Sequence, residues 1–275
     1  MGLGPCPDVM RFRSAEDNTP YDVWRLTYPD KTLVLKKAKG REGEMYAEFL
    51  SADNAFAPAF IASTQWDGDI WLLLEYVPGN DLSRCTRPAL TRVLDALISM
   101  HMQFWNRADA LNTFASALAG REKRMPFLQD SRLESTYQAY LEEFRNLPRT
   151  LCHDDLLPFN VLVSDSGAVL IDWEHCGILP WPTSLARLLA HCQDTEDAFF
   201  YMTDADKAYA INYFYDNFIK IKGIAKESYI KSLKLALFYE YCEWVYLGNR
   251  FDNREGERYR QYLRKALDAA TDLGF

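Results

Sequence analysis

The chain has 275 residues and a formal net charge of −8, with 48% apolar and 25% charged residues. This length can bury a substantial core, either as one large domain or as two lobes. The acidic balance disfavours a nucleic-acid binder, because neutralising phosphates takes clustered Lys and Arg, and it is compatible with a cationic ligand.

The cysteines and the apolar runs bear on the compartment. Six cysteines are scattered along the chain without a Cys-x-x-Cys pair or a Cys/His zinc spacing, which is typical of free thiols in a reducing compartment. The first residues, MGLGPCPDVMRF, lack the basic region and apolar stretch of a secretory signal. No apolar run approaches the roughly 20 residues of a membrane-spanning helix. We therefore expect a soluble cytoplasmic protein that binds neither membranes nor nucleic acid.

The first 80 residues show the alternation that is typical of strands. Residues 21–28, YDVWRLTY, alternate and are rich in aromatic and β-branched types, and the turn YPDK joins them to a partner strand at 32–35. Residues 42–51 change to helical spacing. The pattern breaks at 77–80, VPGN, which predicts a linker. Further strands are predicted at 9–13, 60–65 and 70–76.

Helical patterns dominate after the linker. Residues 88–102 are predicted to form one helix, and the capping box SRLE, which begins at Ser131, opens a second. Residues 161–164 and 168–171 are two short apolar strands joined by the turn Asp-Ser-Gly. Beyond Thr183 the chain is predicted to be helical. The sequence therefore predicts a small β-rich part followed by a larger helical part with an embedded hairpin.

The most informative stretch is LCHDDLLPFNVLVSDSGAVLIDWE, residues 151–174, which places polar side chains between two apolar runs. Asp155 and, five residues later, Asn160 precede the hairpin, and Asp172 follows it. A tight hairpin brings Asn160 and Asp172 to the same end, so an amide and a carboxylate face one site. Such oxygens suit Mg²⁺, which takes one or two protein carboxylates and completes its shell with phosphate and water.

This stretch resembles the catalytic loop and metal-binding motif of the aminoglycoside phosphotransferase and choline kinase superfamily, which is related to the protein kinases. The residues that carry the resemblance are His153-x-Asp155-x-x-x-x-Asn160 and Ile171-Asp172-Trp173. The resemblance implies an α+β, bilobal protein-kinase-like fold. Its small β-rich lobe, residues 1–79, would bind the nucleotide, and its larger, mostly helical lobe, residues 80–275, would carry catalysis and the acceptor.

The resemblance also implies roles for the residues of the motif. Asp155 would orient or deprotonate the acceptor hydroxyl, and Asn160 and Asp172 would hold Mg²⁺. His153 would brace the loop. Asp154 stands where small-molecule kinases of this superfamily often have glycine, and the resemblance assigns it no role.

A fold of this kind needs a lysine on its third strand to contact the nucleotide phosphates, and a helix glutamate to hold that lysine. The run LVLKKA supplies Lys36 and Lys37, of which strand alternation lets only one face the cleft. Lys36 is the prediction, because it directly follows the apolar run. Glu44 is its predicted partner, and Glu42 and Glu48 are the alternatives.

Two other segments are implied to contact the nucleotide, which is predicted to be ATP, with GTP left open. LLLEYVPG resembles the hinge between the lobes, where backbone groups of Glu75 and Val77 would pair with the adenine edge. The connection SAEDNTP between the first two strands has no glycine, so the predicted donors to phosphate are Ser14, Asn18 and Thr19.

The helical part is predicted to hold the acceptor. A helix around residues 233–247 places carboxylates among aromatic side chains, an arrangement that suits a cationic amine. A core helix with glutamates at its rim is the competing interpretation. Ser184 stands where the superfamily often has an aspartate before Leu-Ala-Arg, and it is predicted to cap the helix less well. The candidate acceptor residues are Glu240, Tyr241, Glu243 and Trp244.

These features together predict an ATP- and Mg²⁺-dependent kinase that phosphorylates a hydroxyl of a small cationic molecule, such as an aminoglycoside or another amino sugar. A choline- or ethanolamine-type kinase is the alternative of the same class. A catalytically silent kinase-like binding module is the alternative of another class, motivated by the glycine-free connection. The sequence does not distinguish a monomer from a dimer.

Overall fold

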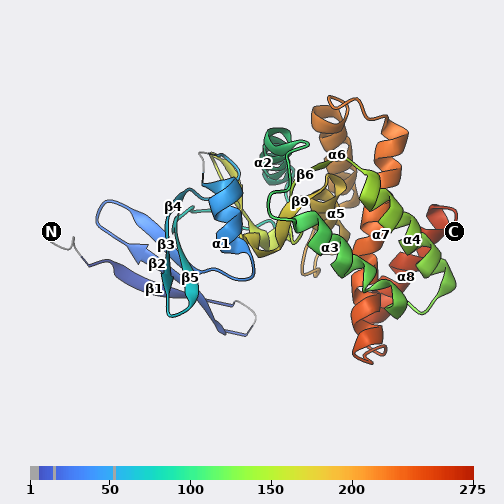
Figure 1. Cartoon of the computed structure of the whole chain (residues 1–275), viewed down its shortest axis with the longest axis horizontal. Helices are drawn as coiled ribbons and strands as arrows, with labels where there is room; N and C mark the ends of the chain where they lie inside the picture. Colours follow the sequence, from blue (N-terminus) through green and yellow to red (C-terminus); the bar gives the residue numbers. More distant parts are fainter. Residues whose placement is uncertain (1–5, 15–16, 52–53) are drawn as a thin grey trace.

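The N-terminal part of the computed structural model, which describes residues 6–14, 17–51 and 54–275, is a five-stranded antiparallel sheet. Its strands are arranged in the order β1-β2-β3-β5-β4. The sheet lies at one end of the molecule, and helices α4, α7 and α8 lie at the other (Figure 1). The strands are β1 (Asp8–Arg13), β2 (Pro20–Thr27), β3 (Thr32–Lys37), β4 (Phe60–Trp66) and β5 (Asp69–Glu75).

One face of this sheet is covered by the short helix α1 (Glu42–Met45), which continues as a π-helical turn over Tyr46–Leu50. Leu72 and Leu74 alternate along β5 and are buried in the same apolar cluster as Met45 and Leu50. The sequence predicted one regular helix at 42–51. The change to π geometry after a single turn alters which side chains of this segment face the sheet.

The remainder of the chain is mostly helical, and the predicted α+β class is confirmed. Two short antiparallel pairs, β6–β9 and β7–β8, are embedded in it. The helices are α2 (Arg87–Phe104), α3 (Thr113–Glu122), α4 (Ser131–Asn146), α5 (Pro182–Ala190), α6 (Asp204–Phe214), α7 (Lys226–Arg250) and α8 (Glu257–Asp272). The strands are β6 (Arg149–His153), β7 (Val161–Ser164), β8 (Gly167–Leu170) and β9 (Cys176–Pro180).

The sequence did not predict α3, β6 or β9. The two strands pair with each other and are buried almost throughout, so neither shows the polar–apolar alternation of a half-buried strand. The capping prediction for α4 was wrong by one residue. Asp130, rather than Ser131, is the N-cap, and its carboxylate accepts the backbone N–H groups of Arg132 and Leu133 at 3.0 Å.

A continuous apolar core joins the sheet to the β7–β8 hairpin. Phe56 follows α1 and packs with its ring centroid 6.1 Å from Phe104 of α2 and 6.2 Å from Trp173. The backbone N–H of Leu170 in β8 donates to the carbonyl of Phe56 at 2.8 Å. These contacts fix the hairpin, and therefore Asp172 at its end, relative to the sheet.

The cysteines and the helix lengths bear on two predictions made from composition. The six cysteines are free thiols, and all except Cys6 are buried. No helix in the described part of the chain has both the length and the apolar character needed to cross a membrane. The lobe boundary at residues 79 and 80 stays a prediction.

The linker passes close to the hairpin. Asn80 pairs with Val163 of β7 through two backbone hydrogen bonds of 3.0 and 2.8 Å. A Cβ atom on the neighbouring Gly79 would lie 2.8 Å from the carbonyl oxygen of Val163. Glycine at this position therefore permits the close approach between the linker and the strand that follows Asn160.

We predict that Gly79→Ala lowers the free energy of unfolding by about 1–3 kcal/mol, because the added methyl group overpacks against backbone. Gly120→Ala is the matched control, since Gly120 lies in α3 with open space around it, and alanine there should raise stability by about 0.5–1 kcal/mol. Urea unfolding of both variants tests this, and equal stability of the two would contradict the close-packing account.

Candidate active site

The segment predicted to be catalytic begins at the end of a buried strand. His153 is the last residue of β6, rather than the start of a loop, and it is fully buried. Its Nε2 lies 2.8 Å from the carbonyl oxygen of Ile171, and its ring lies 5.0 Å from that of Trp173. Burial lowers the pKa of His153, which keeps the ring neutral. His153 therefore contacts the backbone directly before Asp172, in agreement with a bracing role.

Asp155, Asn160 and Asp172 come together at one end of the β7–β8 hairpin. The amide of Asn160 donates to the backbone carbonyl of Asp155 at 2.8 Å and to its Oδ2 at 3.3 Å. The backbone carbonyl of Asn160 accepts the N–H of Ile171 at 2.9 Å, next to Asp172. Asp172 has φ 66°, a left-handed conformation that Asp adopts more readily than most residues. The predicted juxtaposition of an amide and two carboxylates is thus present.

Lys36 connects the sheet to this site. Its Nζ lies 2.6 Å from Oδ1 of Asp172 and 2.7 Å from Oε1 of Glu42. Burial opposes the charge of Lys36, but the carboxylates of Glu42 and Asp172 outweigh it and raise the pKa of its ammonium group. Asp172 is half-buried, and partial burial opposes its charge, yet the attraction of Lys36 lowers the pKa of its carboxyl group. Lys37 points to the other face of the sheet and pairs with Asp69 at 2.7 Å.

The predicted Lys36–Glu44 pair is wrong. Glu44 is exposed and forms an ion pair with Arg41 at 2.7 Å, whereas Glu42, one of the alternatives, is only 1% exposed and faces Lys36. The residue at which α1 begins decides which glutamate faces Lys36. The helix begins at Glu42 itself, so its first residue faces the strand, and Glu44 lies about 200° further round the helix.

The predicted hinge follows β5. Leu33 of β3 is the register partner of Glu75, and the backbone N–H of Glu75 donates to Ala59 at 2.9 Å. Within the described part of the chain, the N–H of Val77 donates to no backbone carbonyl. The N–H of Val77 could therefore donate to a ligand, whereas that of Glu75 is already used within the sheet.

The described residues of the connection between β1 and β2, Ser14 and 17–19, form hydrogen bonds with one another. The backbone N–H of Ser14 donates to Thr19 at 2.8 Å, and Asn18 has φ 59°. The hydroxyl of Thr19 donates to Oδ2 of Asp17 at 2.8 Å, so its proton is already used. Thr19 is therefore a poorer phosphate donor than predicted. Two residues of this connection, Ala15 and Glu16, lie outside the described residues.

Asp154, which had no predicted role, forms a partly buried ion pair. Arg121 of α3 is fully buried and donates from Nη2 to Oδ1 of Asp154 at 2.6 Å. The guanidinium group also lies over the rings of Phe144 and Tyr239, at 4.6 and 4.7 Å from their centroids. Asp154 therefore anchors the catalytic segment to α3 through a charge pair enclosed by aromatic rings.

A cavity of about 450 Å³ opens beside Asp155. Both carboxylates predicted to bind the acceptor, Glu240 and Glu243, line it. Tyr241 and Trp244 do not line this cavity, and their contact with the acceptor stays a prediction. Their rings lie 6.3 and 6.0 Å from that of Tyr262 in α8. This side of α7 therefore packs against α8 and not against the cavity. The aromatic residue of α7 in the cavity wall is Tyr239.

The main residue that the sequence analysis missed is Arg187 of α5. Its Nη2 lies 2.8 Å from Oδ1 of Asp155, and its Nη1 lies 2.9 Å from Glu240 and 2.5 Å from Glu243. The only signal in the sequence was the Leu-Ala-Arg element that follows Ser184. Ser184 is not a helix cap, because α5 starts at Pro182, and its hydroxyl accepts the backbone N–H of His153 at 2.8 Å.

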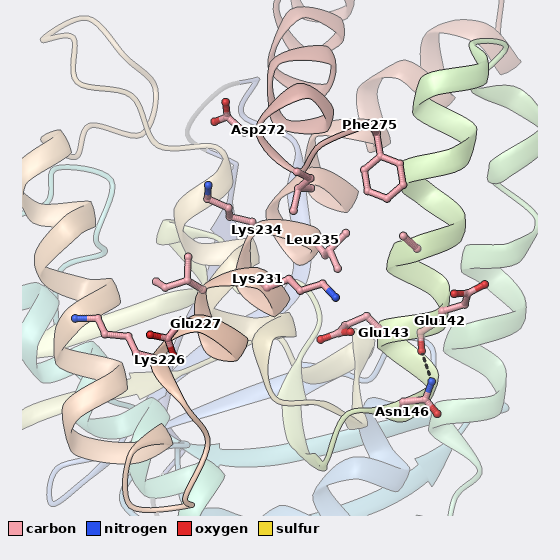
Figure 2. Close-up of a pocket in the computed structure, with 13 residues that line it drawn as sticks. Glu142, Glu143, Asn146, Lys226, Glu227, Lys231, Lys234, Leu235, Asp272 and Phe275 are labelled. Carbon is pink, nitrogen blue, oxygen red and sulfur yellow. Dashed lines mark hydrogen bonds between the residues drawn. The ribbon is translucent and has the colours of Figure 1, made fainter.

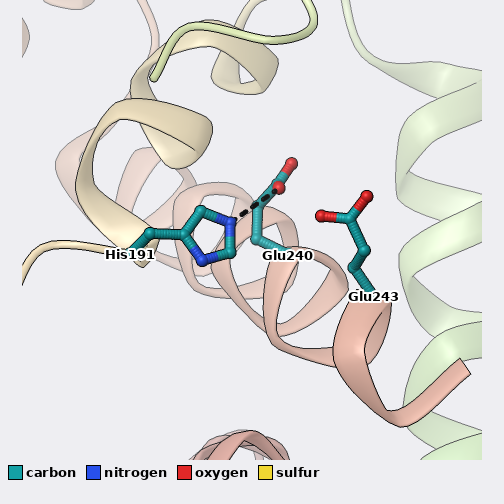
Figure 3. A group of neighbouring side chains, drawn as sticks. All are labelled: His191, Glu240 and Glu243. Carbon is teal, nitrogen blue, oxygen red and sulfur yellow. Dashed lines mark ion pairs between the residues drawn. The ribbon is translucent and has the colours of Figure 1, made fainter. Parts of the chain in front are cut away.

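His191, Glu240 and Glu243 form a group whose ligand atoms lie within 4.8 Å of one another (Figure 3). His191 follows α5, and the two glutamates project from α7. Nη1 of Arg187 already lies between these side chains, 3.1 Å from Nε2 of His191. The positive charge that compensates Glu240 and Glu243 in this structure is thus the guanidinium group of Arg187.

A second cavity, of about 750 Å³, lies between α4, α7 and the last residues of the chain (Figure 2). Its wall contains Lys226, Lys231 and Lys234 and also Glu142, Glu143 and Glu227. It contains no residue of the catalytic motif, and its charges are mixed. Although it is the larger cavity, it is not the candidate active site.

The fold is protein-kinase-like, and the site brings the residues of the predicted catalytic motif together. A sequence model of the phosphotransferase enzyme family matches residues 11–214, well over half of the chain. The chain belongs to this family, and the predicted resemblance and enzyme class are confirmed.

Two curated relatives are similar to this chain over 192 residues at 26% identity. Both are called Protein LicA and come from Haemophilus influenzae, one of them from strain ATCC 51907 / DSM 11121 / KW20 / Rd. The match covers 67% of this chain, and 54% of one relative and 68% of the other. The chain thus spans about half the length of the first relative and two thirds of the second.

Solved structures show the same fold at low sequence identity. Choline kinase from Cryptosporidium parvum Iowa II matches with a TM-score of 0.63 and 13% identity over 97% of this chain and 90% of that one. A thermostable mutant of aminoglycoside phosphotransferase APH(4)-Ia, in a ternary complex with AMP-PNP and hygromycin B, matches with a TM-score of 0.60 and 14% identity, over 99% and 97%. The predicted protein-kinase-like fold is confirmed.

We predict that Glu42→Gln lowers the free energy of unfolding by about 1–3 kcal/mol, because it removes a charged hydrogen-bond partner from the buried Lys36. Glu44→Gln is the control and should change stability by less than about 0.5 kcal/mol, since it removes only an exposed pair with Arg41. Urea unfolding at neutral pH measures both. A larger loss in Glu44→Gln than in Glu42→Gln would contradict the assignment of the Lys36 partner.

Proposed function

We propose that this protein transfers the γ-phosphoryl group of ATP to a hydroxyl group of a small, cationic molecule. The observation that carries the proposal is the meeting of Asp155, Asn160, Asp172 and Lys36 at the end of the β7–β8 hairpin. Asp155 also lines a cavity that contains further carboxylates. Phosphoryl transfer depends mostly on positioning and on charge stabilisation, and this group of side chains supplies both.

The nucleotide would lie between the sheet and the β7–β8 hairpin. Lys36, held by Glu42 and Asp172, would contact the phosphates, and the backbone of Glu75 and Val77 would pair with the base. Ser14 and Asn18 in the turn between β1 and β2 stay candidates for phosphate contacts. The complexes of the similar aminoglycoside phosphotransferase with AMP-PNP and with ADP support ATP as the phosphoryl donor.

Asn160 and Asp172 are the residues that would hold Mg²⁺. The amide nitrogen of Asn160 donates to Asp155, which leaves its oxygen as a ligand, and Asp172 offers a carboxylate. Such oxygen donors fit a hard divalent ion. When bound, Mg²⁺ would neutralise the charge that develops on the phosphates.

Asp155 would act on the acceptor. Its Oδ1 is held by Arg187, and its Oδ2 receives only a long hydrogen bond from Asn160, of 3.3 Å. An acceptor hydroxyl in the cavity could therefore donate to Oδ2. As its oxygen attacks the γ-phosphorus, the bond from that phosphorus to the bridging oxygen of ADP breaks, and the hydroxyl proton passes to Asp155.

The charged residues of the cavity wall indicate what charge the acceptor would carry. Its wall contains the carboxylates Asp154, Asp155, Glu174, Glu240 and Glu243, and the guanidinium groups Arg41, Arg124 and Arg187. The acidic excess favours a cationic acceptor, of which an aminoglycoside-like molecule or an amino sugar is the leading class. The three arginines keep that excess small, which favours an acceptor with a single ammonium group, such as choline or ethanolamine, as the second candidate.

The test is a screen for Mg²⁺-dependent ATP consumption with kanamycin A, glucosamine, choline and ethanolamine. We expect at least one of them to stimulate turnover, EDTA to abolish it, and Asp155→Asn to lower kcat by about 10²–10⁴-fold while the protein still binds ATP. Thermal unfolding with and without MgATP monitors that binding.

Two results would contradict the proposal. If none of the acceptors stimulates turnover and MgATP gives no thermal shift, the chain is not a kinase of this kind. If Asp155→Asn retains the wild-type kcat, a residue other than Asp155 acts on the acceptor.

A further inference from the structure

Arg187 contacts both the residue proposed to act on the acceptor and the carboxylates proposed to bind it. Nε and Nη2 of its guanidinium group face Oδ1 of Asp155, at 3.2 and 2.8 Å. Nη1 faces the carboxylates of Glu240 and Glu243. The side chain is 13% exposed and borders the cavity.

The guanidinium group is planar, and its donors are fixed relative to one another. A shift of Nη1 toward or away from the glutamates must therefore move the two nitrogens that hold Asp155. Lysine could not make the same link, because its ammonium group is a point charge on a flexible stem. The geometry thus connects the acceptor-binding wall of the cavity to the orientation of one carboxylate.

The pKa shifts of Arg187 and Glu240 indicate that both partners of this ion pair are charged. Burial opposes the charge of Arg187, but Glu240, Glu243 and Asp155 outweigh it and raise the pKa of the guanidinium group further above its usual value. Glu240 is only 3% exposed, and the attraction of Arg187 outweighs its burial and lowers the pKa of its carboxyl group. Arg187 and Glu240 are therefore both charged near neutral pH.

We propose that Arg187 is a positioning residue that orients Asp155 and couples this orientation to Glu240 and Glu243. An acceptor ammonium group that draws on the two glutamates would weaken their hold on Nη1 and leave the guanidinium group to Asp155 alone. Occupancy of the acceptor site would in this way be transmitted to the carboxylate that receives the hydroxyl proton. This inference rests on the proposed function.

The experiment compares Arg187→Gln and Arg187→Lys with the wild type, using kanamycin A and choline as separate acceptors. Arg145→Gln is the matched control, since it removes an arginine from an exposed pair with Glu122. We expect kcat to fall about 10²-fold in Arg187→Gln, because a carboxylate misplaced by about 1 Å costs that much. Arg187→Lys should recover part of the loss, Arg145→Gln should equal the wild type, and the KM for ATP should change less than twofold throughout.

A double-mutant cycle tests the coupling itself. Glu243→Gln should lower kcat in the wild-type background and have no further effect on kcat in the Arg187→Gln background, because its influence passes through the guanidinium group. Effects on kcat that multiply in the double variant, or a kcat of Arg187→Gln within threefold of the wild type, would overturn the proposal.

A crystal structure of Arg187→Gln separates this inference from the proposed function, because it requires no turnover. We expect the carboxylate of Asp155 to leave the position that Arg187 holds. A wild type that turns over none of the four acceptors and shows no thermal shift with MgATP contradicts the proposed function, whereas an unmoved Asp155 in the variant contradicts the positioning role.

Discussion

The attraction between Lys36 and Asp172 is the interaction on which the arrangement of the site depends. These residues lie 136 positions apart in the sequence, one on the central strand of the sheet and one at the end of the β7–β8 hairpin, yet their charged atoms are 2.6 Å apart. The pair sets the distance between the element that would hold the nucleotide and the element that would hold the metal. Glu42 completes it from α1, so three separate elements share one buried positive charge.

Ion pairs with other elements also hold the rest of the catalytic segment in place. Three of its aspartates each have a cation from a different element: Asp154 has Arg121 of α3, Asp155 has Arg187 of α5, and Asp172 has Lys36 of β3. Carboxylates this close to one another in a partly buried region would repel each other without such partners. The acidic stretch that stood out in the sequence is therefore a set of anchored charges, and each anchor joins the loop to another part of the fold.

Much of the site could be predicted because its central residues lie close together in sequence. The spacing from Asp155 to Asn160 and the return of the hairpin to Asp172 are local features, and a tight hairpin can bring these residues together in only one way. The five strands of the sheet were predictable for the same reason, since their alternation and turns are local.

The sequence did not predict which side of a helix faces a neighbour, nor contacts between residues far apart in the chain. Whether Glu42 or Glu44 faces Lys36 depends on where α1 begins, and whether Tyr239 or Tyr241 faces the cavity depends on how α8 packs on α7. Arg187 lies 32 residues from Asp155 and 53 from Glu240, so only the docking of α5 against α7 reveals its partners. Helical spacing shows which residues share a face, but not which neighbour that face meets.

The central claim is that the chain transfers a phosphoryl group to a small hydroxyl compound at Asp155. Phosphorus NMR of the wild type with MgATP and each candidate acceptor tests this most directly, because it identifies the product. We predict that a new phosphomonoester resonance and ADP appear in equal amounts, and that Asp155→Asn suppresses both. Formation of ADP and inorganic phosphate alone with every acceptor, or a phosphomonoester formed equally fast by Asp155→Asn, would contradict the account.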